Sequence, residues 1–149
     1  MYSRILVAVD DSETSKLALQ EAVKLAHDQN ARLCIVYVLD EFVPAGEGVP
    51  VDFKKYESSI KKEGKLVLNE MIELAKKSHN QIESHLVEIV EPNDSIPTKI
   101  LAEADKWGAD LIVLGTHGRS GLPRLLLGSV AEEVIRNTTV PVHLVRGPD

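Results

Sequence analysis

The residues best suited to chemistry lie in one short segment, from position 115 to position 130. The segment contains no acidic residue, and its candidate ligand-binding residues are three glycines, two arginines and a serine: Gly115, Gly118, Arg119, Arg124, Gly128 and Ser129. Glycine has no Cβ, so the backbone can turn sharply and a ligand can approach it closely. Guanidinium groups, hydroxyls and unpaired backbone N–H groups all bind phosphate oxygens. The segment therefore predicts an anion-binding loop, although either arginine could equally be a solvated surface charge.

The segments on either side of this loop predict how it is positioned. An uninterrupted apolar run at 111–114 precedes it and predicts a buried strand that ends at Gly115. An amphipathic stretch from 129 to 137 follows, and its first hydroxyl, on Ser129, can cap a helix. A strand, a loop and a helix in this order place a helix N-terminus, with its N–H groups and positive dipole end, at the expected anion.

Apolar segments alternate with predicted helices along the whole chain. We expect five strands, with a helix between each strand and the next: 5–9, 33–39, 82–90, 111–114 and 140–145. This alternation predicts an α/β fold, in which one doubly wound five-stranded parallel sheet carries helices on both faces. No linker or repeat interrupts the pattern, so we expect a single domain over residues 1–149.

The hydropathy of the strands predicts their order in the sheet. Polar residues such as Glu83 and His85 interrupt the third strand, and Pro141 removes a ladder hydrogen bond from the fifth, so both strands belong at edges. The other three runs are almost entirely apolar and belong inside. The order 3-2-1-4-5 satisfies these conditions. It opens a crevice between strands one and four, which Asp10 and Gly115 both face.

Local features predict how the helices begin and pack. Asp11 or Ser12 can cap the first helix, and residues 91–94 form a turn and cap before a helix that carries Pro97 in its first turn. A long helix after the second strand contains Gly64 on its apolar stripe, which costs about 1 kcal/mol relative to alanine. Close packing against a neighbouring strand explains that glycine best.

Composition and charge narrow the classes of partner. The chain of 149 residues has 17 basic and 23 acidic side chains and a formal charge of −6, which disfavours binding to nucleic acid or to an anionic membrane. No apolar run approaches the roughly 20 residues of a membrane span, and the N-terminus shows no signal-peptide pattern. The single cysteine, Cys34, lies in an apolar strand, where we expect a buried inert thiol rather than a nucleophile. These features predict a cytoplasmic protein.

The glycine segment differs from the common nucleotide-binding motifs. The chain has no G-x-x-x-x-G-K-[ST] loop and no G-x-G-x-x-G after its first strand. The pattern Gly115-x2-Gly118-x9-Gly128-Ser129 instead resembles the ATP-binding signature of the universal stress protein family. The resemblance covers essentially the whole chain, and it includes the segments 5–12, 36–38 and 109–115 and the run Val140-Pro141-Val142.

The resemblance implies an adenosine-nucleotide site with ATP as the ligand. By matching position, Asp10 would contact the adenosine end through the ribose or the base, and Val38 would contact adenine through its backbone. The ribose and phosphates would be held by Gly115, Gly118, Gly128, Ser129 and Val130. Magnesium or manganese is expected only as a partner of the triphosphate. The middle loop at 40–50 varies within the family, so its role stays open.

Three functions remain open from the sequence. The first is a nucleotide-binding stress or regulatory module with slow ATP hydrolysis or none. The second is a phosphoryl- or adenylyl-transfer enzyme, which is disfavoured because the chain has no P-loop lysine and His117 has no orienting carboxylate nearby in sequence. The third is a dimeric adaptor in which the nucleotide is structural. We also expect a homodimer through the edge strand at 140–145, on the grounds of its exposed edge and of the family resemblance.

Overall fold

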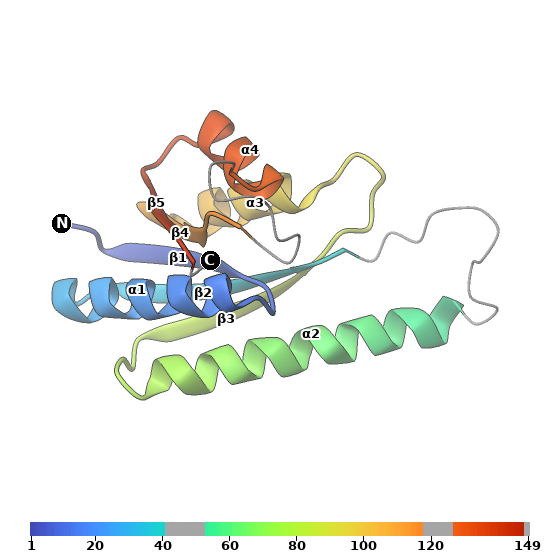
Figure 1. Ribbon diagram of the computed structural model, residues 1–149, viewed down its shortest axis with the longest axis horizontal. Helices are drawn as coiled ribbons and strands as arrows, with labels where there is room; N and C mark the ends of the chain where they lie inside the picture. Colours follow the sequence, from blue (N-terminus) through green and yellow to red (C-terminus); the bar gives the residue numbers. More distant parts are fainter. Residues whose placement is uncertain (41–52, 118–126, 148–149) are drawn as a thin grey trace.

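The computed structural model describes residues 1–40, 53–117 and 127–147 of the chain and contains a five-stranded sheet (Figure 1). The elements follow in the order β1 (Arg4–Val9), α1 (Glu13–Gln29), β2 (Arg32–Leu39), α2 (Phe53–Lys76), β3 (Ile82–Glu88), α3 (Ile96–Trp107), β4 (Leu111–Gly115), α4 (Ser129–Asn137) and β5 (Val142–Val145). The strands lie in the order β3-β2-β1-β4-β5, and each neighbouring pair is parallel. The predicted doubly wound α/β fold and its strand order are confirmed.

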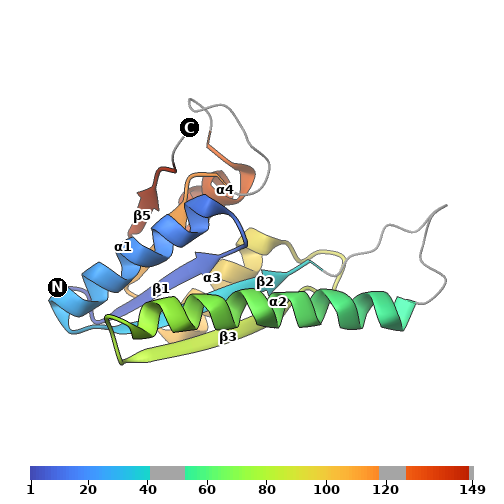
Figure 2. The same cartoon turned by 60° about the horizontal axis from the view of Figure 1, so that its bottom comes forward.

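Two helical layers cover the sheet (Figures 1 and 2). α1 and α2 pack on one face, and α3 and α4 pack on the other. Because successive side chains of a strand point to opposite faces, β1 contributes Ile5 and Val7 to the first core and Leu6 to the second. This double burial explains why the inner strands are continuous apolar runs. In the described part of the chain, no helix combines the length and apolar character needed to cross a membrane.

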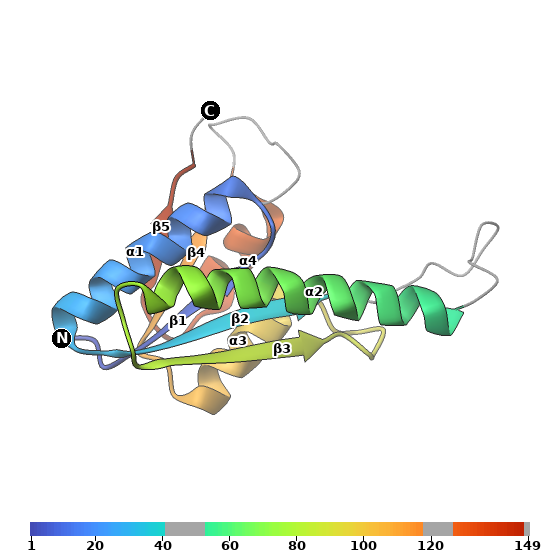
Figure 3. The ribbon, with the colours of Figure 1, turned by 90° about the horizontal axis from the view of Figure 1, so that it is seen from below.

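α2 has 24 residues and lies along β2 and β3 (Figure 3). Its Gly64 is buried against the end of β2, where an added Cβ would lie 2.5 Å from Leu39 Cδ2. The close packing predicted for this glycine is therefore confirmed. Lys61, three residues earlier, pairs with Glu88 of β3 at 2.7 Å. These two contacts hold the middle of α2 against the sheet at two points.

β3 and β5 form the two edges of the sheet, as predicted. Every residue of β3 is partly exposed, and the strand ends at Glu88 rather than at position 90. The prediction that the fifth strand begins at Val140 was wrong, because β5 begins at Val142. The Thr138 hydroxyl accepts the N–H of Val140 at 3.0 Å and donates to its carbonyl at 2.7 Å. These bonds hold Val140 in a turn before the strand.

Serine hydroxyls cap two of the helices. Ser12 accepts the N–H of Ser15 at 3.1 Å at the start of α1, so it is the cap among the two residues that the sequence allowed. The predicted cap within residues 91–94 was wrong: α3 is capped by Ser95, which forms a capping box with Thr98. A hydroxyl three residues before a second hydroxyl satisfies two backbone N–H groups, which positions 91–94 cannot do. Pro97 lies in the first turn of α3, as predicted.

Candidate functional site

Asp10 follows β1 directly, and the first turn of α1 orients its carboxylate. Its Oδ1 accepts the N–H of Ser12 at 2.8 Å, and its own N–H donates to the buried Ser15 hydroxyl at 2.7 Å. These bonds fix one carboxylate oxygen against the chain. The other oxygen, Oδ2, has no partner among the described residues, so it can accept a hydrogen bond from a ligand.

Thr116, directly after β4, connects the end of the sheet to the start of α4. Its N–H donates to the Val145 carbonyl at 2.9 Å, and its carbonyl accepts the N–H of Gly128 at 2.7 Å. Its buried hydroxyl lies 3.0 Å from His117 Nδ1. Thr116 therefore joins the two ends of the glycine segment, so that strand β4 ends where helix α4 begins.

α4 has Gly128 as its N-cap, and no side chain caps it. The prediction that the Ser129 hydroxyl caps this helix was wrong, because the bond from Gly128 to the strand end places Gly128 at the cap and makes Ser129 the first helical residue. The first intrahelical bond runs from Glu132 to Gly128. The N–H groups of Ser129, Val130 and Ala131 thus have no acceptor within the described ranges, and they lie at the positive end of the helix dipole.

A cavity of about 690 Å³ lies at the carboxyl ends of the strands, between these residues. It brings together six of the eight residues predicted to contact a nucleotide: Asp10, Val38, Gly115, Gly128, Ser129 and Val130. The other two, Gly118 and Arg119, lie outside the described residues, as does the loop expected at 40–50 apart from Asp40. The strand order explains the meeting of residues from opposite ends of the chain, because the crevice opens where the chain crosses from one face of the sheet to the other.

Two of the glycines are required by the packing of the protein itself. A Cβ on Gly115 would lie 2.6 Å from Thr14 Cγ2 of α1, and one on Gly128 would lie 3.0 Å from the Thr116 carbonyl oxygen. Both distances are shorter than ordinary contacts of carbon with its neighbours. We expected these glycines to lack a Cβ so that a ligand can approach them. The same lack of a Cβ lets α1 pack against Gly115 and lets the chain after β4 pack against Gly128.

The cavity has walls that no motif indicated. α2 contributes Ser59, Ile60 and Glu63, and α3 contributes two isoleucines near its start. The apolar pattern of α2 does not indicate that the helix reaches the carboxyl end of the sheet. Gly64 was the one available signal, because its packing against β2 brings the neighbouring turns of α2 to the cavity.

The two ends of the cavity differ in chemistry. At the α4 end lie the unpaired N–H groups, the Ser129 hydroxyl and His117, all suited to phosphate oxygens. At the β1 and β2 end lie Asp10 and Asp40, whose carboxylates accept hydrogen bonds from hydroxyl or amino donors. In the described ranges, no three His, Cys, Asp or Glu side chains are arranged to hold a metal ion. These residues fit a ligand that is anionic at one end and carries donors at the other.

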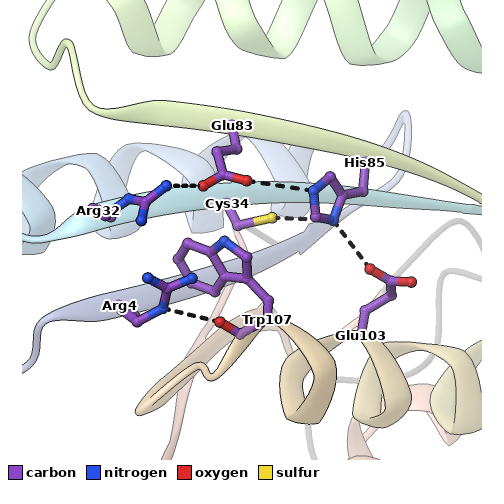
Figure 4. Close-up of polar contacts among 7 residues, drawn as sticks. All are labelled: Arg4, Arg32, Cys34, Glu83, His85, Glu103 and Trp107. Atoms are coloured by element: carbon purple, nitrogen blue, oxygen red, sulfur yellow. Dashed lines mark hydrogen bonds and ion pairs between the residues drawn. The ribbon is translucent and has the colours of Figure 1, made fainter.

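A second polar cluster lies between β2, β3 and the end of α3 (Figure 4). His85 is at its centre, and its Nδ1 lies 3.0 Å from Glu103 Oε2 and 3.7 Å from Cys34 Sγ. Its Nε2 lies 3.5 Å from Glu83 Oε2, and Glu83 also pairs with Arg32. Cysteine beside histidine is the arrangement of an activated nucleophile, so the protonation of the thiol decides whether this cluster can act as one.

Burial disfavours the reactive form of this cysteine. Cys34 has no exposed surface, and burial raises the pKa of its thiol from 9.0 to about 12, with a smaller contribution from the nearby carboxylates. The predicted burial of this thiol is confirmed. Since the thiolate is the nucleophilic form, a thiol with a raised pKa is a poor nucleophile at neutral pH. The cluster instead attaches α3 to the sheet.

Trp107, at the end of α3, completes this attachment. It is buried, and its ring lies 4.3 Å from the Arg4 guanidinium carbon, a cation–π contact. The Arg4 Nε also donates to the Trp107 carbonyl at 2.9 Å. The indole nitrogen forms no hydrogen bond of normal geometry in the described part of the chain. The indole N–H, and to a smaller extent Arg32, lower the pKa of the Glu83 carboxyl below its ordinary value of 4.5.

Comparison with known proteins gives a consistent match. A family model described as the universal stress protein family matches residues 1–146. Universal stress protein MJ0531 of Methanocaldococcus jannaschii is 35% identical, and the alignment covers 99% of this chain and 84% of that protein. Universal stress protein YxiE of Bacillus subtilis is 36% identical, and the alignment covers 98% of this chain and 100% of that protein.

Solved structures with the same fold include nucleotide complexes. A universal stress protein in complex with cAMP is 29% identical with a TM-score of 0.69, and the alignment covers 97% of each chain. The universal stress protein from Archaeoglobus fulgidus in complex with dAMP is 26% identical with a TM-score of 0.69, and the alignment covers 97% of this chain and 98% of that chain. Since the family model matches nearly the whole length and full-length relatives exceed 30% identity, this chain belongs to the universal stress protein family.

Proposed function

We propose that this protein binds adenosine nucleotides, ATP among them, and acts as a stress or regulatory module with slow ATP hydrolysis or none. The observation that carries the proposal is the presence, in one cavity, of Asp10 Oδ2 and the unpaired N–H groups of the first turn of α4. The carboxylate accepts hydrogen bonds from a nucleoside, and the N–H groups donate to phosphate. The relatives complexed with cAMP and dAMP support this class of ligand, because both ligands are adenine nucleotides.

The proposal assigns a role to each end of the cavity. Asp10 accepts a hydrogen bond from the ribose or the base, and the backbone of Val38 contacts adenine. The ribose and phosphate end comprises Gly115, Gly118, Arg119, Gly128, Ser129 and Val130, of which Gly118 and Arg119 are assigned from the signature alone. Magnesium or manganese enters only with a triphosphate, bound through its phosphate oxygens.

Removal of the Ser129 hydroxyl tests the proposal. Ser129→Ala deletes one donor to phosphate, so the affinity for AMP and ATP should fall roughly three- to tenfold in equilibrium binding measurements. The free energy of unfolding should change by less than about 0.5 kcal/mol, because Gly128 and not Ser129 is the cap of α4.

Ser95→Ala is the matched control for this variant. Ser95 caps α3 in a capping box, so its loss should cost about 1 kcal/mol of stability while the nucleotide affinity is retained. If Ser129→Ala retains the wild-type affinity, the phosphates do not bind at the start of α4. A wild-type protein that binds neither AMP nor ATP would refute the proposal as a whole.

The alternative is a phosphoryl- or adenylyl-transfer enzyme, and a single-turnover assay with labelled ATP separates the two. The chain has no lysine after Lys106 to neutralise charge on a transferred phosphoryl group beside the glycine segment. We therefore expect hydrolysis slower than about one turnover per minute. Faster hydrolysis or transfer would favour the enzyme.

A dimeric adaptor with a purely structural nucleotide requires a different test. Substitution of Gly128 does not separate it from a regulatory module, since an added Cβ would press on the Thr116 carbonyl with or without a ligand. Unfolding measured with and without AMP separates the two functions. A regulatory ligand adds only the stability expected from its affinity and concentration, whereas a structural nucleotide is needed for the protein to fold.

We also infer a cytoplasmic location. The one cysteine of the chain, Cys34, is free and buried, which suits a reducing compartment. Fractionation of cells that produce the protein tests this inference, and recovery with the extracellular fraction would contradict it.

A further inference from the structure

His117 is the residue of the described cavity lining that gains a positive charge as the pH falls. The rest of the described lining contains three carboxylates, those of Asp10, Asp40 and Glu63, and no lysine or arginine. Histidine ordinarily titrates between about pH 5 and pH 8, whereas carboxyl groups ordinarily titrate below this range and arginine above it. The other charged groups on the elements around His117 are therefore constant near neutral pH: Asp11 and Glu13 at the start of α1, Glu132 in the first turn of α4 and Arg146 after β5.

His117 also lies beside the start of α4, where the proposed function places the phosphates. A Cβ on Gly128, the N-cap of α4, would lie 3.6 Å from His117 Cα. The imidazole is held by its neighbour in the chain, because His117 Nδ1 lies 3.0 Å from the buried Thr116 hydroxyl. A hydroxyl donates to an unprotonated ring nitrogen and accepts from a protonated one. The contact with Thr116 therefore holds the imidazole in either state, and protonation requires only that the hydroxyl hydrogen turns.

We infer that nucleotide binding to this protein is coupled to the uptake of a proton by His117. The inference rests on the proposed function, because it requires a nucleotide phosphate at the start of α4. A phosphate beside the imidazole favours the imidazolium, which takes its proton from the solvent. Because coupling between two ligands is reciprocal, the bound proton in turn favours the phosphate. The affinity for the nucleotide therefore falls as the pH rises through the range in which histidine titrates, so that the nucleotide occupancy of the protein responds to pH.

Isothermal titration with cAMP tests this coupling, because the cyclic phosphodiester keeps a single charge near neutral pH. The phosphate of AMP, in contrast, takes up a second proton near pH 6. The affinity of the wild type for cAMP should fall roughly three- to tenfold from pH 6 to pH 8, since His117 is only partly buried and one charged contact is at stake.

The proton itself is counted at pH 7, in buffers that differ in ionisation enthalpy. Binding to the wild type should take up a fraction of a proton, on the order of 0.5. His117→Gln retains an amide that forms hydrogen bonds but cannot titrate. This variant should bind cAMP with an affinity that does not change between pH 6 and pH 8, and without proton uptake.

His27→Gln is the matched control. His27 is exposed in the last turn of α1 and does not line the cavity, so this variant should keep the pH dependence and the proton uptake of the wild type. Circular dichroism at both pH values establishes that each variant is folded.

Each outcome of the titrations bears on the coupling. A wild type that binds cAMP without proton uptake, or a His117→Gln variant that keeps the wild-type pH dependence, would overturn the inference and leave the proposed function intact. If the wild type binds AMP and not cAMP, the difference in proton uptake between the wild type and His117→Gln decides in the same way, because both proteins bind the same titrating phosphate. A wild type that binds neither nucleotide would overturn both proposals.

Discussion

Cys34 lies 3.7 Å from an imidazole, yet its pKa of about 12 keeps the thiol neutral at physiological pH. Because the thiolate is the reactive form, Ellman's reagent at pH 8 should modify the native protein only as fast as the protein opens. Unfolding in guanidinium should expose one full equivalent of thiol. The measurement is the absorbance of the released thionitrobenzoate, and a native rate equal to that of a free thiol would show that β2 is not buried as described.

At the site, the sequence predicted which residues lie at the crevice better than it predicted their structural roles. Asp10, Gly115 and Gly128 were expected at the crevice and lie there. Ser129 also lies there, but as the first residue of α4 rather than as its cap. The difference arises from one hydrogen bond, from Gly128 to Thr116, between residues that are separated by the glycine segment. A local capping pattern contains no information about that bond.

At the scale of the elements, Gly64 sets how closely α2 approaches β2. A change from glycine to alanine in an exposed helix stabilises by about 1 kcal/mol. Here the added Cβ would lie 2.5 Å from the buried Leu39 side chain, and overpacking of this kind costs about 1–3 kcal/mol. We therefore expect Gly64→Ala to lower the free energy of unfolding by about 1 kcal/mol in urea denaturation.

A double-mutant cycle with Leu39→Val provides the control. Valine is shorter, so the second substitution should be less harmful in the Gly64→Ala background than in the wild type. Net stabilisation by Gly64→Ala alone would mean that α2 does not pack closely on β2.

The attachment of α3 to the edge of the sheet should depend on pH. The pKa of Glu83 is lowered by the Trp107 indole N–H and by Arg32. A carboxyl group with a lower pKa in the folded state stabilises that state above its unfolded pKa, and the contribution is lost as the pH falls through the folded value. The stability difference between the wild type and Glu83→Gln should therefore be full well above 4.5 and should shrink as the pH falls below 4.5.

Urea denaturation at a series of pH values measures this difference. Glu73→Gln, at an exposed position on α2, should show little difference from the wild type at any pH. If the effect of Glu83→Gln is the same at acidic and neutral pH, the carboxylate form of Glu83 contributes nothing to the attachment of α3.

For the whole molecule, we expect association of two copies through β5. This strand ends the sheet, and an unpaired edge favours pairing with another chain. β5 has only four residues, so side chains around the strand must supply part of the interface. Val142→Lys places a charge at this edge and should shift the protein toward monomer.

Sedimentation velocity at micromolar concentration measures this shift. Ser84→Lys introduces the same charge on β3, the opposite edge, and should leave association unchanged. A wild-type protein that is a stable monomer over the dilution series would contradict the predicted homodimer.

Much of the architecture could be predicted because hydropathy separates the strands so clearly. Runs such as that of β2, buried along nearly its whole length, can lie only inside a sheet covered on both faces. The polar residues of β3 and Pro141 before β5 exclude both strands from the interior. The exact start of β5 was less predictable, because the turn at Thr138 competes with pairing at Val140.

The sequence by itself determined the class of fold, the order of the strands and the edge of the sheet where a ligand can bind, because these follow from periodic burial and from the crossover of the chain. Only the tertiary structure decided which side chains complete the cavity. The approach of α2 with Glu63 depends on the contact of Gly64 with Leu39, and the unpaired start of α4 depends on the bond from Gly128 to Thr116. Both are contacts between residues distant in sequence, which local patterns do not record.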